Sequence, residues 1–238
     1  MKIRNLTLSG VVAACALAAT PAMAQEAEDT SGITISGSAT VVSDYRFRGI
    51  SQTDEDFAIQ GGFTAAHESG FYVGTWGSSI DLYSSGSNAE IDVFGGYGGK
   101  INDLLAFDVG LLYYIYPGVD GNTDYFEPYA SISGDIGPVS AKLGAAYVWK
   151  GQSAVGNNDN IYVYTDISTA IPGTPFTAKA HVGYSDGSLA GNSHYWDYSV
   201  GAEMSWKSLT FGVSYVDTDL GNYRGVDSAV LFSVGTSF

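Results

Sequence analysis

The chain has 238 residues, with 10 Lys or Arg against 25 Asp or Glu, a formal net charge of −15 and one cysteine. This acidity excludes nucleic acid as an expected partner, because phosphate binding needs clustered Lys and Arg. A single cysteine excludes a disulfide framework within the chain. Beyond residue 24 no continuous apolar segment approaches ~18 residues, so no membrane-spanning helix is predicted.

The first 24 residues have the pattern of a secretory signal peptide. Lys2 and Arg4 precede an apolar stretch over 6–19, and small residues stand before Gln25. We predict cleavage after Ala24, which leaves eight Lys or Arg against 25 Asp or Glu and no cysteine. The alternative is lipidation at Cys15, but the residues that follow it stay apolar up to the cleavage site. Residues 25–32 are then a short periplasmic segment.

From residue 33 the chain alternates apolar residues with small or polar ones, which is the period of a β-strand. The first strand is predicted from Ile33 to Phe47, with Tyr45 and Phe47 on its apolar face. Further strands are predicted over 57–65, 71–80, 89–97, 105–115 and 126–132. The pattern leaves open which face of the strand at 71–80 points outward.

The second half of the chain continues the alternation, with prolines at 172 and 175 confined to a turn. Its strands are predicted over 139–149, 161–167, 176–184, 196–206, 209–215 and 229–238, with a long loop over 185–194. Long polar connections alternate with short turns along the chain, which is typical of outer-membrane barrels and has no cause in a soluble sandwich. We predict an all-β fold, a transmembrane antiparallel up-and-down β-barrel of 12 strands over residues 33–238.

The last ten residues resemble the signal by which outer-membrane barrels are assembled. One face of this strand carries Val230, Phe232, Val234 and Phe238, and the other carries small residues. The alternative is an edge strand of a soluble sandwich. Aromatic residues gather beside the loops and beside the turns of the other strands, as in two interfacial girdles. The expected partners are therefore outer-membrane lipids and the barrel-assembly machinery.

Charged residues of the strands share the small or polar face. A Lys or Arg that faces lipid at mid-membrane costs about 2 to 4 kcal/mol, so this face is predicted to line the interior. The candidate pore-lining residues are Asp44, Arg46, Arg48, Glu90, Asp92, Asp108, Glu127, Lys142, Asp166, Lys179, Asp197 and Glu203. We expect Arg46 to line the conducting path. Arg48, beside Gly49, is expected to hold a neighbouring loop by paired hydrogen bonds to a carboxylate.

Three sequence motifs are distinctive enough to compare with known families. They are DYRFRGISQ from Asp44 to Gln52, whose YRFRGIS part is the most specific, GFYVGTW at 70–76 and GGY at 95–97. These motifs resemble the TorF porin family, and the likeness covers residues 33–238. The resemblance implies an outer-membrane porin-like barrel. It brings neither a substrate nor catalytic residues.

The remaining motifs do not indicate catalysis or a cofactor. His67 is expected in a turn, His194 in a loop and His181 on the inward face, without the spacing of a hydrolase or protease site. The sequence GGYGGK at 95–100 lacks the first glycine and the final Ser or Thr of a phosphate loop. Acidic loops such as 54–56 lack the EF-hand spacing for calcium. We predict no enzyme, no cofactor and no metal site.

The acidic lumen and loops predict a passive channel for small hydrophilic solutes or ions that prefers cations. The alternative is a non-conducting structural or surface-interaction barrel. Eight-stranded barrels are filled and barrels of 16 to 18 strands are open, and twelve lies between them. Both hypotheses therefore stay open at this point.

Overall fold

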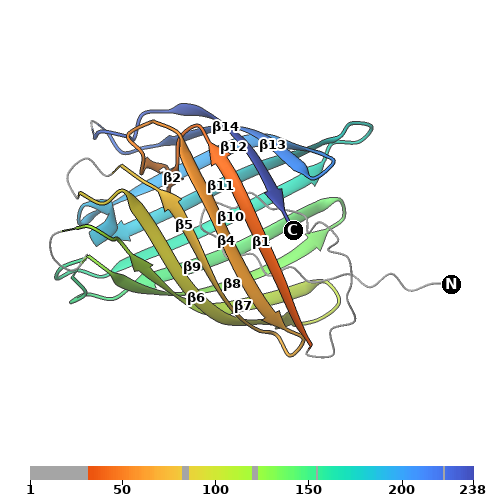
Figure 1. Cartoon of the computed structure of the whole chain (residues 1–238), viewed down its shortest axis with the longest axis horizontal. Helices are drawn as coiled ribbons and strands as arrows, with labels where there is room; N and C mark the ends of the chain where they lie inside the picture. The colour runs from red at the N-terminus through yellow and green to blue at the C-terminus, as the bar shows by residue number, and fades with distance from the viewer. Residues whose placement is uncertain (1–31, 82–85, 120–122, 154, 222) are drawn as a thin grey trace.

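The computed structural model describes residues 32–81, 86–119, 123–153, 155–221 and 223–238. The predicted signal peptide lies outside these ranges. Twelve strands close into one antiparallel barrel, with each strand paired to its neighbour along the chain and β1 (Ile33–Val42) paired to β14 (Ala229–Ser237) (Figure 1). This confirms the predicted fold class and the strand number.

The other barrel strands follow the predicted alternation closely. They are β4 (Ala58–His67), β5 (Phe71–Ser79), β6 (Ala89–Lys100), β7 (Leu105–Ile115), β8 (Tyr125–Ile136), β9 (Val139–Val148), β10 (Asn160–Ala170), β11 (Phe176–Gly187), β12 (Ser193–Trp206) and β13 (Leu209–Thr218). Two further strands, β2 (Arg46–Phe47) and β3 (Ile50–Ser51), form a separate two-stranded sheet.

The connections differ between the two ends of the barrel. At one end, here the loop end, lie the connections 43–57, 80–88, 116–124, 149–159, 188–192 and 219–228. At the other, the turn end, lie the short connections 68–70, 101–104, 137–138, 171–175 and 207–208. The tightest turns use left-handed backbone, for example Gly137 with φ 64°. A 3-10 turn over Ser188–Ala190 lies in one loop, and in the described part of the chain no helix is long and apolar enough to cross a membrane.

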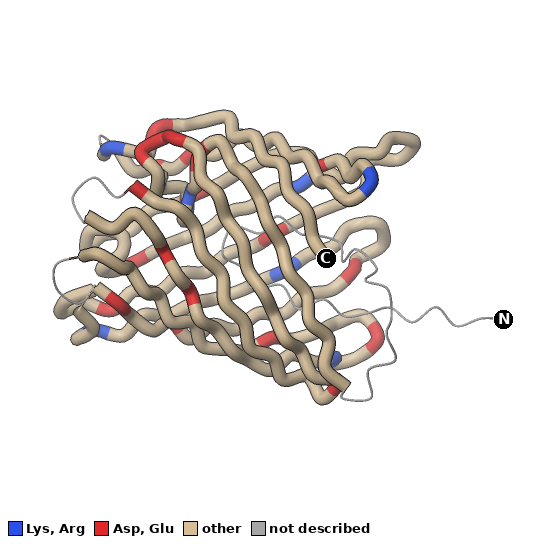
Figure 2. The backbone as a smooth tube through the Cα atoms, viewed as in Figure 1, with Lys and Arg blue, Asp and Glu red and all other residues tan. Residues whose placement is uncertain are grey.

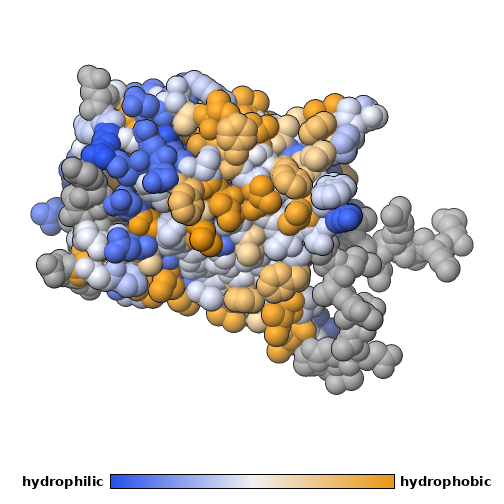
Figure 3. Space-filling view, turned by 45° about the horizontal axis from the view of Figure 1, so that its top comes forward, coloured by the Kyte–Doolittle hydropathy of each residue, from blue (hydrophilic) through white to orange (hydrophobic). Residues whose placement is uncertain are grey.

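The outer wall of the barrel is apolar. Large hydrophobic side chains are exposed on it, as with Ile59 at 61%, Val200 at 60% and Phe232 at 60%. Figure 3 shows these hydrophobic surfaces over the wall, beside a hydrophilic region at one end. On β5, Phe71 and Val73 are exposed whereas Tyr72 is half-buried, so Phe71 and Val73 belong to the outer face that the sequence pattern left open.

Two sequence predictions about this wall are wrong. The first strand ends at Val42 rather than at Phe47, and Tyr45 is only 1% exposed, so this side chain does not belong to the outer aromatic girdle. The predicted loop over 185–194 is shorter, because β11 and β12 extend to Gly187 and Ser193. In both cases the backbone pairing extends or stops independently of the apolar alternation.

Candidate functional site

A short hairpin from the first loop lies inside the barrel. In this lumen hairpin, residues 46–51, Arg46 pairs with Ser51 and Phe47 with Ile50. Its two central residues, Arg48 with φ 49° and Gly49 with φ 82°, both have left-handed backbone, as a two-residue type I′ turn requires. A Cβ at Gly49 would overlap the Thr218 side chain of β13. Glycine therefore lets the tip approach the barrel wall closely.

Asp44 fixes the base of the lumen hairpin. Its carboxylate accepts hydrogen bonds from Arg46 Nε at 2.5 Å, Ser51 Oγ at 2.6 Å and Thr53 Oγ1 at 3.1 Å. Thr53 Oγ1 also accepts the N–H of Tyr45 at 3.1 Å. Because Asp44 is only 5% exposed, these charge-assisted bonds hold both strands of the hairpin in one geometry.

Arg46 joins the base of the lumen hairpin to the loop over 219–228. Its Nη1 donates to the carbonyl oxygens of Gly49 at 3.2 Å, Gly225 at 2.8 Å and Asp227 at 3.0 Å. Arg46 is 5% exposed. The structure places the Arg46 guanidinium among the packed loops, and its role in lining a conducting path stays a prediction.

Arg48 reaches from the tip of the hairpin to the far wall. Its Nη2 donates to both carboxylate oxygens of Glu127 on β8, at 2.8 and 2.7 Å. The guanidinium carbon lies 4.1 Å from the ring centroid of Tyr162 on β10 and 4.8 Å from that of Phe47. The Tyr195 hydroxyl donates to the Arg48 carbonyl at 3.1 Å. One ion pair and two aromatic rings thus hold the tip.

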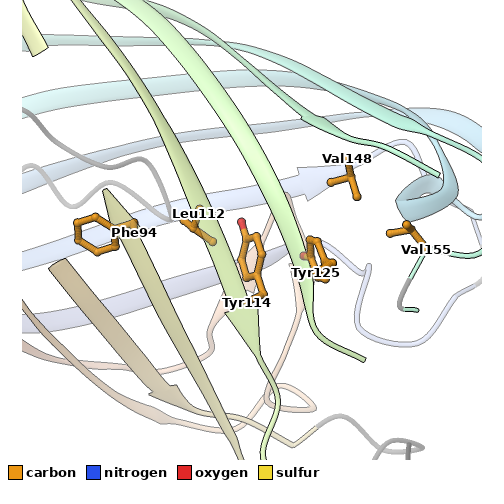
Figure 4. Close-up of a cluster of buried hydrophobic side chains, with 6 residues drawn as sticks. All are labelled: Phe94, Leu112, Tyr114, Tyr125, Val148 and Val155. Atoms are coloured by element: carbon orange, nitrogen blue, oxygen red, sulfur yellow. The ribbon is translucent and has the colours of Figure 1, made fainter. Parts of the chain in front are cut away.

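Apolar side chains fill the space around the lumen hairpin at the loop end. Phe47 packs against a buried cluster drawn from β6 to β9 and the following loop (Figure 4). Its ring meets that of Tyr114 edge-on at 5.9 Å, and Tyr45 meets Trp76 in the same way at 5.4 Å. The cluster comprises Phe94, Leu112, Tyr114, Tyr125, Val148 and Val155.

Two carboxylates of β6 are buried beside this cluster. Glu90 is 2% exposed and interacts with the hydroxyls of Tyr45 and Tyr116. Asp92 is 1% exposed, and among the residues that the structure describes neither of its carboxylate oxygens has a hydrogen-bond partner. Glu127 lies close enough for charge repulsion with Asp92. Burial of such a group without a donor is costly.

The turn-end half of the lumen contains charged groups that are more exposed. Lys179 Nζ donates to Glu203 at 2.8 Å, with side chains 21% and 11% exposed. His181, with a side chain 25% exposed, lies between two carboxylates. Its Nδ1 is 2.6 Å from Asp166, which is 29% exposed, and its Nε2 is 3.0 Å from Asp197, which is 3% exposed and belongs to the packed loop-end part. The lumen is therefore packed at the loop end and open to a greater degree at the turn end.

On the wall of β5 to β9, the turn-end half carries a second polar group. The Tyr72 hydroxyl donates to Asp108 at 2.9 Å and lies 2.6 Å from the Tyr129 hydroxyl. Lys142 Nζ lies 5.7 Å from the ring centroid of Tyr164. Figure 2 shows Asp and Glu on strands and loops, with far fewer Lys and Arg. Every candidate pore-lining residue lies either in the first loop or on a strand, and each of these side chains is buried or half-buried.

The predicted assembly strand lies on the outer wall. Val230 is 56% exposed, Phe232 60%, Val234 42% and Phe238 56%. Its role in assembly stays a prediction. Of the other two histidines, His67 Nδ1 contacts Ser69 in a turn at 2.7 Å and His194 lies on β12, opposite Asp186. Within the described ranges no three His, Cys, Asp or Glu side chains are arranged to hold a metal ion.

The sequence interpretation missed the aromatic partners of Arg48. Tyr162 and Tyr195 hold the arginine, and Tyr114 donates to Glu127 at 3.1 Å. The inward parity of Tyr114 and Tyr162 was visible in the alternation. Arg48-Gly49 stands between Arg46-Phe47 and Ile50-Ser51. A residue followed by glycine between two short extended segments is a signal for a two-residue turn, and it could have marked the hairpin.

Comparison with known proteins identifies a family and a fold. The family model described as "Bacterial protein of unknown function (Gcw_chp)" matches residues 26–238. No curated protein sequence matches the chain. This match identifies the family of the chain over residues 26–238, and the resemblance to the TorF family stays a prediction.

Solved structures share the barrel at low sequence identity. The NanC porin in a rhombohedral crystal form superposes with a TM-score of 0.60 at 13% identity, over 86% of this chain and 99% of that chain. The KdgM porin gives a TM-score of 0.59 at 12% identity, over 85% and 98%. The CymD monoaromatic hydrocarbon channel gives 0.50 at 9% identity, over 87% of each chain. At these identities the likeness establishes the fold alone.

Proposed function

We propose that this chain, which belongs to the Gcw_chp family, forms an outer-membrane channel for passive diffusion of small hydrophilic solutes or ions, with a preference for cations. The observation that carries the proposal is the sorting of side chains across the barrel wall. Many large hydrophobic side chains are exposed on the outside of the strands, and the charged strand residues are on the inward face. An apolar surface of this extent needs to be covered, and closure of the barrel leaves no strand edge in lipid.

The outer-membrane location is part of the proposal and has three supports. The barrel has the fold of the NanC and KdgM porins. Residues 1–24 have a signal-peptide pattern, and the TorF resemblance implies the same location. In this proposal the outer wall contacts membrane lipid and β14 presents its apolar face to the assembly machinery. The chain then acts as a channel rather than as an enzyme.

The proposed cation preference follows from the balance of charge in the lumen. Arg48 and Lys179 are each paired to a carboxylate, and His181 lies between two more. On the wall of β6 and β7, Glu90, Asp92 and Asp108 add further acidic groups. A low-dielectric bore lined by an excess of one charge concentrates the opposite ion.

Recordings from the refolded protein in planar bilayers test this proposal. Discrete conductance steps are expected, with a reversal potential in a KCl gradient that favours K⁺ over Cl⁻. The preference is expected to weaken as ionic strength rises, because salt screens the field of the lumen. Heat-modifiable gel mobility provides the control for folding. Folded protein that gives no steps contradicts the channel, and equal K⁺ and Cl⁻ permeability contradicts the cation preference.

One observation favours the second candidate function, a non-conducting structural or surface-interaction barrel. The loop end of the lumen is filled by the lumen hairpin and by the apolar cluster around it. The same recordings separate the two candidates, since a structural barrel gives no steps at any salt concentration.

A further inference from the structure

We infer that the lumen hairpin is the constriction of the proposed channel, and that the Arg48–Glu127 contact is the latch that holds it across the bore. This inference rests on the proposed function. The hairpin begins in the connection between β1 and β4, yet Arg48 contacts Glu127 on β8 and Tyr162 on β10. In the strand order these lie on the far side of the closed barrel from β1 and β4. The hairpin therefore crosses the bore rather than covering its mouth.

The burial of the inward residues shows where the bore is narrow. Around the hairpin the inward side chains are buried, with Glu127 4% and Tyr114 2% exposed. Toward the turn end, the side chains of His181 and Asp166 are 25% and 29% exposed. Since the wall has the same strands along its whole length, the difference comes from what the first loop inserts. A solute that crosses the barrel has to pass the hairpin.

The base and the tip of the hairpin are held in different ways. At the base, Asp44 and Arg46 make hydrogen bonds to the hairpin itself and to the loop over 219–228, and Ser51 N–H donates to the Gly225 carbonyl at 2.8 Å. At the tip, the Arg48 side chain donates hydrogen bonds to Glu127 through Nη2. Arg48 Nη1 has no hydrogen-bond partner among the described residues. The base is thus fixed by several hydrogen bonds. At the tip, Tyr162 and Tyr195 also contact Arg48, but among the described residues Glu127 is the only carboxylate paired with its charge.

The chemistry of the pair predicts how the constriction can be released. If Glu127 loses its charge, the Arg48 guanidinium is left buried and without a counter-ion, which is strongly unfavourable. The arginine can regain solvation only if the tip leaves its site. Loss of the Glu127 charge is therefore expected to widen the bore while the barrel wall, which the pair does not join, stays closed.

Single-channel conductance of a set of variants tests the inference. Glu127→Gln and Arg48→Glu should each raise the conductance several-fold, and the charge swap Arg48→Glu with Glu127→Arg should bring it back toward the wild-type value. A second route removes the tip alone, by replacing Phe47 to Ile50 with Gly-Gly while the base residues remain. This variant should conduct at least as well as Glu127→Gln, because nothing then crosses the bore.

The matched control is Arg224→Gln. Arg224 pairs with Asp54 and so joins the first loop to the loop over 219–228, as Arg46 does at the base of the hairpin. The Arg224 side chain is 57% exposed and lies outside the packed lumen, so its loss should leave conductance unchanged. If the wild-type protein gives conductance steps and the latch and tip variants show no higher conductance, the constriction is overturned and the channel proposal stands. Steps in the tip variant alone support the constriction and overturn free diffusion through the wild-type protein. No steps in any folded variant overturn the channel itself, and a failed charge-swap rescue overturns the latch.

Discussion

Asp44 and Asp92 are both buried carboxylates, but their surroundings are opposite. Asp44 accepts hydrogen bonds from Arg46, Ser51 and Thr53. Asp92 is without a donor among the described residues and lies near Glu90 and Glu127. A buried charge is tolerated when hydrogen bonds replace its hydration, and it costs free energy when they do not.

This contrast predicts opposite effects of the same isosteric substitution. Asp44→Asn should lower the free energy of unfolding by about 1 to 3 kcal/mol, because it weakens charge-assisted bonds at the base of the hairpin. Asp92→Asn should leave stability unchanged or raise it, because it removes repulsion between buried like charges. The midpoint of the heat-dependent gel shift in detergent measures both. A lower midpoint for Asp92→Asn than for Asp44→Asn would contradict this account.

At the scale of the element, β14 tests the assignment of the inner and outer faces. Val234 is 42% exposed and pairs with Val41 and Phe211, whereas the neighbouring Ser233 is half-buried on the opposite face. In the proposed membrane, Val234→Lys places a charge in lipid at a cost of about 2 to 4 kcal/mol near mid-membrane. Ser233→Lys places the same charge in the lumen. Val234→Lys should reduce the amount of folded barrel in membranes, and Ser233→Lys should not; equal yields would show that the faces are assigned wrongly.

The barrel wall could be predicted from the sequence because each strand carries its own pattern. Alternation over Leu105 to Ile115 or Val139 to Val148 depends only on which side faces the lumen, whereas the strand at 71–80 has large side chains on both faces and its orientation came from the structure. The lumen hairpin could not be found in this way. Tyr45 and Phe47 continue the parity of the first strand, so a strand that continues and a strand that ends and turns inward have the same pattern.

The contacts of the candidate site are also beyond what alternation can provide. Arg48 and Glu127 are 79 residues apart, and their meeting depends on how the loop folds across the bore. Alternation places Glu127 on the inward face but does not say which group on another wall reaches it. The expected roles of Arg46 and Arg48 therefore needed the structure. The sequence predicts that Arg48 pairs with a carboxylate of a neighbouring loop, and the structure places the carboxylate on β8, across the lumen.

At the scale of the whole molecule, the barrel closes where its first and last strands meet. The β1–β14 register joins Ser38–Val42 to Ser233–Ser237, whereas β1 pairs with β4 along its whole length from Ile33 to Val42. Beyond this short register, two hydrogen bonds between Gly37 and Phe238 extend the seam, at 2.7 and 3.0 Å. The Phe238 ring also meets that of Phe63 edge-on at 6.1 Å. Packing of one aromatic ring therefore supports the seam.

The seam predicts a measurable coupling between Gly37 and Phe238. A Cβ at Gly37 would lie 2.7 Å from the Phe238 ring and 3.0 Å from that of Phe63, so Gly37→Ala should displace Phe238 and lower the midpoint of the heat-dependent gel shift. Phe238→Leu should lower it too, through lost aromatic contact. Because leucine is smaller and leaves room for the new methyl group, the double variant should be more stable than the sum of the single effects allows.

Gly221→Ala is the matched control, since a Cβ there meets no atom within 4 Å and its stability should equal that of the wild type. Additive effects of Gly37→Ala and Phe238→Leu would show that the ring does not occupy the space beside Gly37. Non-additive effects of the two seam substitutions, with Gly221→Ala unchanged, would show that packing of Phe238 beside Gly37 supports closure of the barrel at the β1–β14 seam. The seam is distant from the latch residues, so its variants should change thermal stability without the several-fold rise in conductance expected when Arg48 is released.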